Sequence, residues 1–196
     1  MNAKTELTVK DILGVESYMK IRQERRVKIL NKKKLRRAAV GPYATFYFES
    51  YDTMWYQVQE MLRIEKGGEA QLKDELEAYN PLIPKGRELV ATVMFEIDNA
   101  NIRTAFLLGL GGVENHIIMR LDDVHIMAIA EQDLDRTNAD GKASSVQFVH
   151  FSFTNSQIAK FKDINTNVTV GINHPKYGHM AVLSDETQRE LSTDFL

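Results

Sequence analysis

The side chains most able to ligate a metal are five histidines, all in the second half of the chain: His116, His125, His150, His174 and His179. None has the H-x-x-x-H or H-E-x-x-H spacing of a helical zinc site. Loops at strand ends could still bring His116, His174 and Asp122 together as an imidazole and carboxylate ligand set. One hypothesis is therefore a metal-dependent enzyme, and the alternative is a set of ordinary hydrogen-bonded imidazoles.

Carboxylates form a second group with possible chemistry. Glu49 ends an expected strand, Asp52 is the expected N-cap of the following helix, and Glu60 lies on that helix. Glu60 and Arg63 are i,i+3 neighbours and can form an ion pair. The group could carry out acid–base chemistry or form a structural ion-pair network. The chain has no Glu-x-x-His motif, which excludes a ferritin-like di-iron bundle.

Basic residues are concentrated at the start of the chain, although the whole chain has a net charge of −2. Residues 1–37 contain 12 Lys and Arg against 4 Asp and Glu. The candidate anion-binding or partner-binding residues are Arg22, Arg25, Arg26, Lys32, Lys33, Arg36 and Arg37, with Arg63 beside them. The segment is either a solvated helix face or a surface for an acidic protein or anionic ligand. Nucleic acid is a weaker alternative, because aromatic residues are not interleaved with the cations.

Composition excludes several classes of protein. The 196 residues contain no cysteine, so the chain itself cannot form a disulfide, an iron–sulfur cluster or a Cys-type zinc site. No apolar run approaches the ~20 residues of a membrane span. The first residues lack the basic and apolar regions of a secretory signal. We therefore expect a cytoplasmic protein, whose cofactors and oligomeric state remain open.

The elements that must position these residues begin with a helical part, over residues 1–84. Thr8 and Asp11 resemble a capping box, and roughly helical apolar spacing continues to about residue 34, as one helix or as two with a break at Gly14. Gly41-Pro42 predicts a β-hairpin. Two further helices are expected, one from Asp52 to about Gly67 and one over residues 69–79.

Residues 85–196 are rich in strands and contain a possible internal repeat. The order β-α-β-β is expected over residues 88–130 and again over 145–183. This order predicts an antiparallel sheet of about six strands, built from a duplicated β-α-β-β unit, on which the helical and hairpin part over residues 1–84 packs. The prediction is an α+β fold in a single domain over residues 1–196.

The segment from Arg36 onward resembles a bacterial family known as domain of unknown function 3501. Its members read as a basic run, V-G-P, T-F-x-F-E, D-T and Y-Q-x-Q-E-M-L-R. The matching residues here are Val40, Gly41, Pro42, Thr45, Phe46, Phe48, Glu49, Asp52, Thr53, Tyr56, Gln57, Gln59, Glu60, Met61, Leu62 and Arg63. Looser similarity continues through Tyr79-Asn80, Glu96-Ile97-Asp98, Ser145-Val146-Gln147 and His174-Pro175.

The resemblance implies a context and no chemistry. Members of that family are often encoded beside rubrerythrin-type peroxide-reducing proteins and iron–sulfur electron-transfer proteins. This context implies an accessory protein in peroxide or redox metabolism, with an acidic rubrerythrin-like or electron-transfer protein as its partner. Such an accessory protein would not carry the redox centre itself, in keeping with the missing cysteines.

Overall fold

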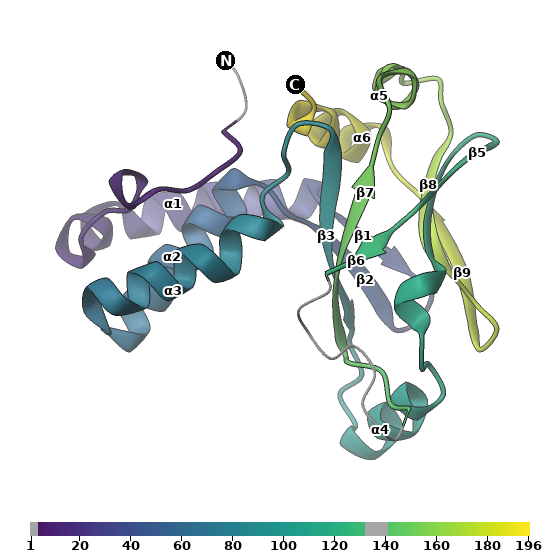
Figure 1. The fold of residues 1–196 in the computed structure, drawn as a ribbon, viewed down its shortest axis with the longest axis horizontal. Helices are drawn as coiled ribbons and strands as arrows, with labels where there is room; N and C mark the ends of the chain where they lie inside the picture. The colour runs from purple at the N-terminus through teal and green to yellow at the C-terminus, as the bar shows by residue number, and fades with distance from the viewer. Residues whose placement is uncertain (1–3, 132–140) are drawn as a thin grey trace.

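The computed structural model describes residues 4–131 and 141–196. It confirms the α+β class, with two antiparallel sheets and an arm of helices that projects from one of them (Figure 1). The helical arm consists of α1 (Val15–Leu35), α2 (Tyr51–Glu65) and α3 (Gly68–Tyr79). α1 packs on α2, and α2 packs on α3. No helix within the described ranges is long and apolar enough to cross a membrane.

The start of the arm follows local capping rules. Thr8 and Asp11 form the expected capping box, in which the Asp11 carboxylate accepts from the backbone N–H and the hydroxyl of Thr8. This box opens only a short 3-10 turn, η1 (Val9–Asp11), and α1 begins after Gly14. Of the two arrangements that the spacing allows, the structure therefore has a short turn followed by one long helix.

The prediction that Asp52 is the N-cap of α2 is wrong. Ser50 caps the helix, and its hydroxyl accepts from the Thr53 N–H at 3.3 Å. The Glu49 N–H donates to the Val90 carbonyl at 2.8 Å, so the strand ladder continues through Glu49 and leaves Ser50 as the cap. Asp52 lies in the first turn instead, where the helix dipole favours a carboxylate.

The first sheet has five strands in the order β1-β2-β3-β7-β6. They are β1 (Arg37–Val40), β2 (Ala44–Phe48), β3 (Glu88–Phe95), β7 (Val146–Ser152) and β6 (Ile129–Ala130). β1 and β2 form the hairpin at Gly41-Pro42. Burial alternates along β2, so that Phe46 faces the other sheet while Tyr47 faces the arm. We call the latter surface the arm side of the sheet.

The second sheet has four strands in the order β5-β4-β8-β9. They are β4 (Ile117–Leu121), β5 (Val124–Met127), β8 (Val168–His174) and β9 (Tyr177–Val182). The six strands expected after residue 84 correspond to β3, β4, β5, β7, β8 and β9. These strands divide between two sheets. The sequence pattern could not predict this division, because alternating burial shows that a strand has one buried face and does not identify the strand that it pairs with.

The order β-α-β-β occurs twice along the chain. The helices within it are α4 (Ala100–Leu108) and α5 (Asn155–Lys162), which lie at opposite ends of the sheets (Figure 1). β3 pairs antiparallel with β7, and β4 pairs antiparallel with β8. Two of the three sets of equivalent strands therefore pair with each other, whereas β5 and β9 lie at opposite edges of the second sheet. A duplicated origin for residues 88–130 and 145–183 stays a prediction.

Two apolar clusters hold the molecule together, since burial of apolar surface is the main force that drives folding. The larger lies between the sheets and includes Phe46 and Met119. The smaller fixes the arm to the first sheet, where Met54 and Val58 of α2 pack with Val90 of β3. The chain then closes with α6 (Asp185–Leu191) and η4 (Ser192–Asp194), and α6 contacts α1.

Candidate functional site

Glu60 is the centre of an ion-pair cluster between α1 and α2. Its Oε1 accepts from Tyr18 Oη at 2.6 Å and from Arg22 Nε at 2.8 Å. Its Oε2 accepts from Arg22 Nη2 at 2.9 Å and from Arg63 Nη2 at 3.0 Å. Arg22 lowers the pKa of Glu60 to about 2, although burial opposes it, with Tyr18 and Arg63 assisting. A carboxylate with so low a pKa is a poor general base near neutral pH. The role of Glu60 is therefore structural, because its hydrogen bonds join α1 to α2.

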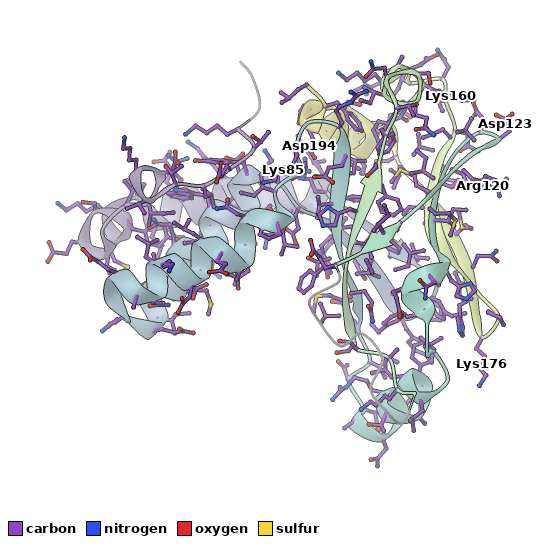
Figure 2. All side chains as sticks on the ribbon, in the orientation of Figure 1. Lys85, Arg120, Asp123, Lys160, Lys176 and Asp194 are labelled. Atoms are coloured by element: carbon purple, nitrogen blue, oxygen red, sulfur yellow. The ribbon has the colours of Figure 1, made fainter. Side chains whose placement is uncertain are left out.

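Arg36, directly after α1, is buried with 1% of its surface exposed. Its Nε donates to the Phe48 carbonyl at 3.0 Å, and its Nη2 donates to the Glu49 carbonyl at 2.7 Å. The guanidinium also pairs with Asp194 of η4 and, at 3.3 Å, with Glu190 of α6. Asp194 lies where the arm meets the sheets (Figure 2). Arg36 therefore anchors the end of α1 and is not part of an exposed basic surface.

Other cations of α1 differ in their surroundings. Lys32 Nζ pairs with Asp52 at 2.6 Å, and the Arg25 guanidinium lies over Trp55, 5.2 Å from the ring centroid. Five cations on α1 or just after it form no ion pair with any residue of 4–131 or 141–196. They are Lys20, Arg26, Lys33, Lys34 and Arg37. The predicted basic surface is thus partly neutralised by the fold and partly left open.

The side of α1 that points away from α2 combines apolar and basic side chains. Met19, Val27 and Leu30 are 51%, 50% and 49% exposed. The 3.6-residue repeat places Lys20, Arg26 and Lys34 on the same side. We call these six residues the α1 outer face. An apolar centre with a charged margin is the usual composition of a protein-binding surface.

A small cavity of about 190 Å³ lies at the base of the arm, between the helices and the first sheet. It is lined by Lys33, Arg36, Tyr47, Phe48, Glu49, Thr53, Thr92 and Met94. We call it the base cavity. It brings together Lys33, Arg36 and Glu49 from the sequence candidates. Asp52 and Glu60 do not line it, so the predicted acid–base group does not converge.

Glu49 is the buried carboxylate of the base cavity, with 8% of its surface exposed. It accepts from Thr53 Oγ1 at 2.7 Å and from Thr92 Oγ1 at 2.8 Å. The sequence motifs include Thr53, but sequence reasoning did not single out either threonine as a site residue. For Thr92 a signal existed: the alternation of β3 places it on the arm side, and the strand register sets it opposite Tyr47.

The predicted metal ligands come together only in part. The rings of His116 and His174 lie edge to face, with centroids 5.0 Å apart. Lys176, two residues after His174, lies at one end of the second sheet, whereas Asp123, next to Asp122, lies at the other (Figure 2). Asp122 therefore does not join the histidines.

Asp122 has a different role in the structure. Its carboxylate pairs with Lys160 Nζ at 3.0 Å, which ties the β4–β5 turn to α5.

Burial lowers the pKa of His174, and the neighbouring His116 lowers it further. Within the described part of the chain, no three His, Asp or Glu side chains are placed to hold a metal ion.

His150 lies between two carboxylates on the arm side of β7. Its Nδ1 is 3.0 Å from Glu88 Oε2, and its Nε2 is 2.6 Å from Glu131 Oε1. Burial lowers the pKa of His150, but hydrogen bonds and charges from both glutamates outweigh burial, so the pKa is raised. The strand register places His150 opposite Val90, two residues from Glu88. Both ring nitrogens are therefore engaged within the fold.

Comparisons with known proteins identify a family and one similar solved structure, both of unknown function. The sequence model described as "Protein of unknown function (DUF3501)" matches residues 6–195. A crystal structure of a novel protein of unknown function from Burkholderia pseudomallei K96243 is 34% identical and has a TM-score of 0.88. The similarity covers 97% of this chain and 99% of that chain. No curated protein matches the chain. The chain therefore belongs to the DUF3501 family of proteins of unknown function, as the motifs from Val40 to Arg63 predict.

Proposed function

We propose that this protein is a cytoplasmic binding protein whose α1 outer face docks on an acidic surface of a partner protein. The observation that carries the proposal is the composition of that face. Three half-exposed apolar side chains lie among three cations that form no ion pair with any described residue. The partner that fits has carboxylates around an apolar patch, because complementary charge speeds association and apolar burial contributes affinity.

An acidic protein fits this face better than nucleic acid does. Phosphate backbones are bound mainly through cations and hydrogen-bond donors. Met19, Val27 and Leu30 would remain exposed to water in such a complex, whereas a protein partner can bury them. The family resemblance directs the first test to rubrerythrin-type and electron-transfer proteins. The metal-dependent enzyme stays a prediction that elemental analysis of untagged protein can address.

The test is a binding titration with a purified rubrerythrin-type protein from the same genome, at low and at moderate salt. A variant with Lys20, Arg26 and Lys34 all replaced by Glu removes the cations of the α1 outer face. We expect about tenfold weaker binding. Loss of three solvent-exposed ion pairs with the partner, each contributing about 0.5 kcal/mol, corresponds to that factor. Arg36 is left intact in this design, because its reversal would unfold the base of the arm.

The matched control reverses Lys73 on α3 and Lys176 between β8 and β9, which are exposed cations away from α1. Equal loss in the control would show non-specific attraction and contradict docking through α1. A duplex oligonucleotide in parallel tests the nucleic-acid alternative, which predicts tight, salt-dependent binding to DNA and none to the protein.

A further inference from the structure

We propose that the base cavity binds a small zwitterion that carries an ammonium and a carboxylate group, as a free α-amino acid does. This inference is independent of the docking proposal, because it rests on side chains at the base of the arm and not on the α1 outer face. It follows from a buried carboxylate, a lysine available on the same cavity, and the volume of the cavity that both residues line.

The ammonium group of the ligand is assigned to Glu49. The hydroxyl groups of Thr53 and Thr92 each donate to one of the two carboxylate oxygens of this buried side chain. A buried charge is normally paired with an opposite charge, yet Glu49 has no ion-pair partner within residues 4–131 and 141–196. Each oxygen retains a second lone pair. A ligand ammonium would supply the missing charge and use those lone pairs.

The carboxylate group of the ligand is assigned to Lys33. Two cations line the base cavity, and the donors of Arg36 already serve the Phe48 and Glu49 carbonyls and two carboxylates. The Lys33 ammonium has three donors and forms no ion pair with a described residue. Lys33 is therefore the cation that remains available to an incoming anion.

The rest of the lining limits the size and polarity of the ligand. Tyr47 and Met94 contribute ring and thioether surface from the arm side of the sheet. The cavity volume of about 190 Å³ is smaller than that of a typical pocket for a drug-sized ligand. The cavity therefore suits a short aliphatic amino acid better than a nucleotide.

The experiment is isothermal titration calorimetry of the full chain with a panel of amino acids, alongside propionate and ethylamine at the same millimolar concentrations. We expect at least one small amino acid to bind, and each single-charge analogue to bind about tenfold more weakly or worse. If ethylamine alone binds as well as the best amino acid, the assignment of Lys33 is wrong. If no amino acid binds, the proposal is overturned.

Variants separate the ligand site from structural effects. Glu49→Gln keeps the shape of the side chain and removes its charge, and we expect at least about tenfold weaker binding because a charge-assisted contact is lost. Lys33→Met leaves the hydrogen bonds of Glu49 in place and should weaken binding similarly, so the test survives if Glu49→Gln fails to fold.

The control is Arg26→Glu on the α1 outer face, which should bind the amino acid like the wild type. The same variant should bind the acidic partner more weakly, so failure of one proposal does not imply failure of the other. If Lys33 and Glu49 merely neutralise each other across the cavity, neither Glu49→Gln nor Lys33→Met changes the heat of titration. That result would also overturn the proposal.

Discussion

Replacing Arg36 with Met tests how the base of the arm is held. The substitution keeps an unbranched apolar stem and removes the guanidinium. It leaves the carbonyls of Phe48 and Glu49 without their donor, and it leaves the buried Asp194 carboxylate without its counter-ion. Glu190 keeps an ion pair with Lys32 at 3.6 Å. Of the four groups that Arg36 contacts, Glu190 therefore loses the least stabilisation.

The expected cost is about 3–5 kcal/mol of unfolding free energy at neutral pH, the usual penalty for removing one partner of a buried ion pair. Most of it arises from Asp194. Burial already raises the pKa of this carboxyl, and Arg36 limits that rise. Without Arg36 the pKa of Asp194 should rise further. Because a carboxyl with a raised pKa destabilises the fold once it ionises, the penalty should shrink as pH falls through that pKa.

Urea denaturation followed by far-ultraviolet circular dichroism measures this free energy. The matched control is Arg37→Met, the adjacent but exposed arginine, which should change stability by less than about 0.5 kcal/mol. A double variant, Arg36→Met with Asp194→Leu, should recover about 1 kcal/mol or more by removing the unpaired charge. Equal losses for the Arg36 and Arg37 variants, or a loss for Arg36→Met that is independent of pH, would refute the reasoning.

Two further predictions concern other polar contacts of the fold. Tyr177→Phe should cost about 1–3 kcal/mol in urea denaturation, because the hydroxyl donates to the Val40 carbonyl at 2.6 Å and accepts from the Tyr43 and Ala44 N–H groups at 3.0 Å; a change near zero would contradict this bridge between the sheets. The raised pKa of His150 stabilises the fold below its ordinary value of 6.5, and this contribution is lost as pH rises through the folded-state pKa. The stability difference between wild type and His150→Gln should therefore decrease from mildly acidic to alkaline pH, and a constant difference would count against it.

Local rules in the sequence predicted the elements well. The Thr8–Asp11 box forms as expected. The β-α-β-β order also occurs in both segments, although the first segment ends in an additional short strand, β6. Pairing between distant strands was beyond these rules. Ser50 and Asp52 are both good capping residues, and the choice between them depends on a long-range hydrogen bond from Glu49 to Val90 on β3.

The candidate sites show the same division between local and distant information. An excess of 12 cations over 4 anions in residues 1–37 correctly indicates a basic segment. It cannot indicate which cations acquire counter-ions, because Glu60 and Asp194 approach Arg22 and Arg36 from 38 and 158 residues away. Arg36 and Arg37 are neighbours in sequence with opposite environments, a difference that only the strand geometry creates.

The division of α1 into two faces connects its stability with the proposed binding. Cations that face α2 and α6 are neutralised by Glu60, Asp52 and Glu190, and these contacts fix the helix along its length. A fixed helix holds the α1 outer face in one arrangement before a partner arrives, which reduces the entropy lost on binding. In the proposed complex, the paired cations would contribute through rigidity, and the unpaired cations would contribute through direct attraction. Repulsion within the basic segment is relieved mainly on the side that faces α2 and α6, and the α1 outer face keeps the charge that the proposed acidic partner would neutralise.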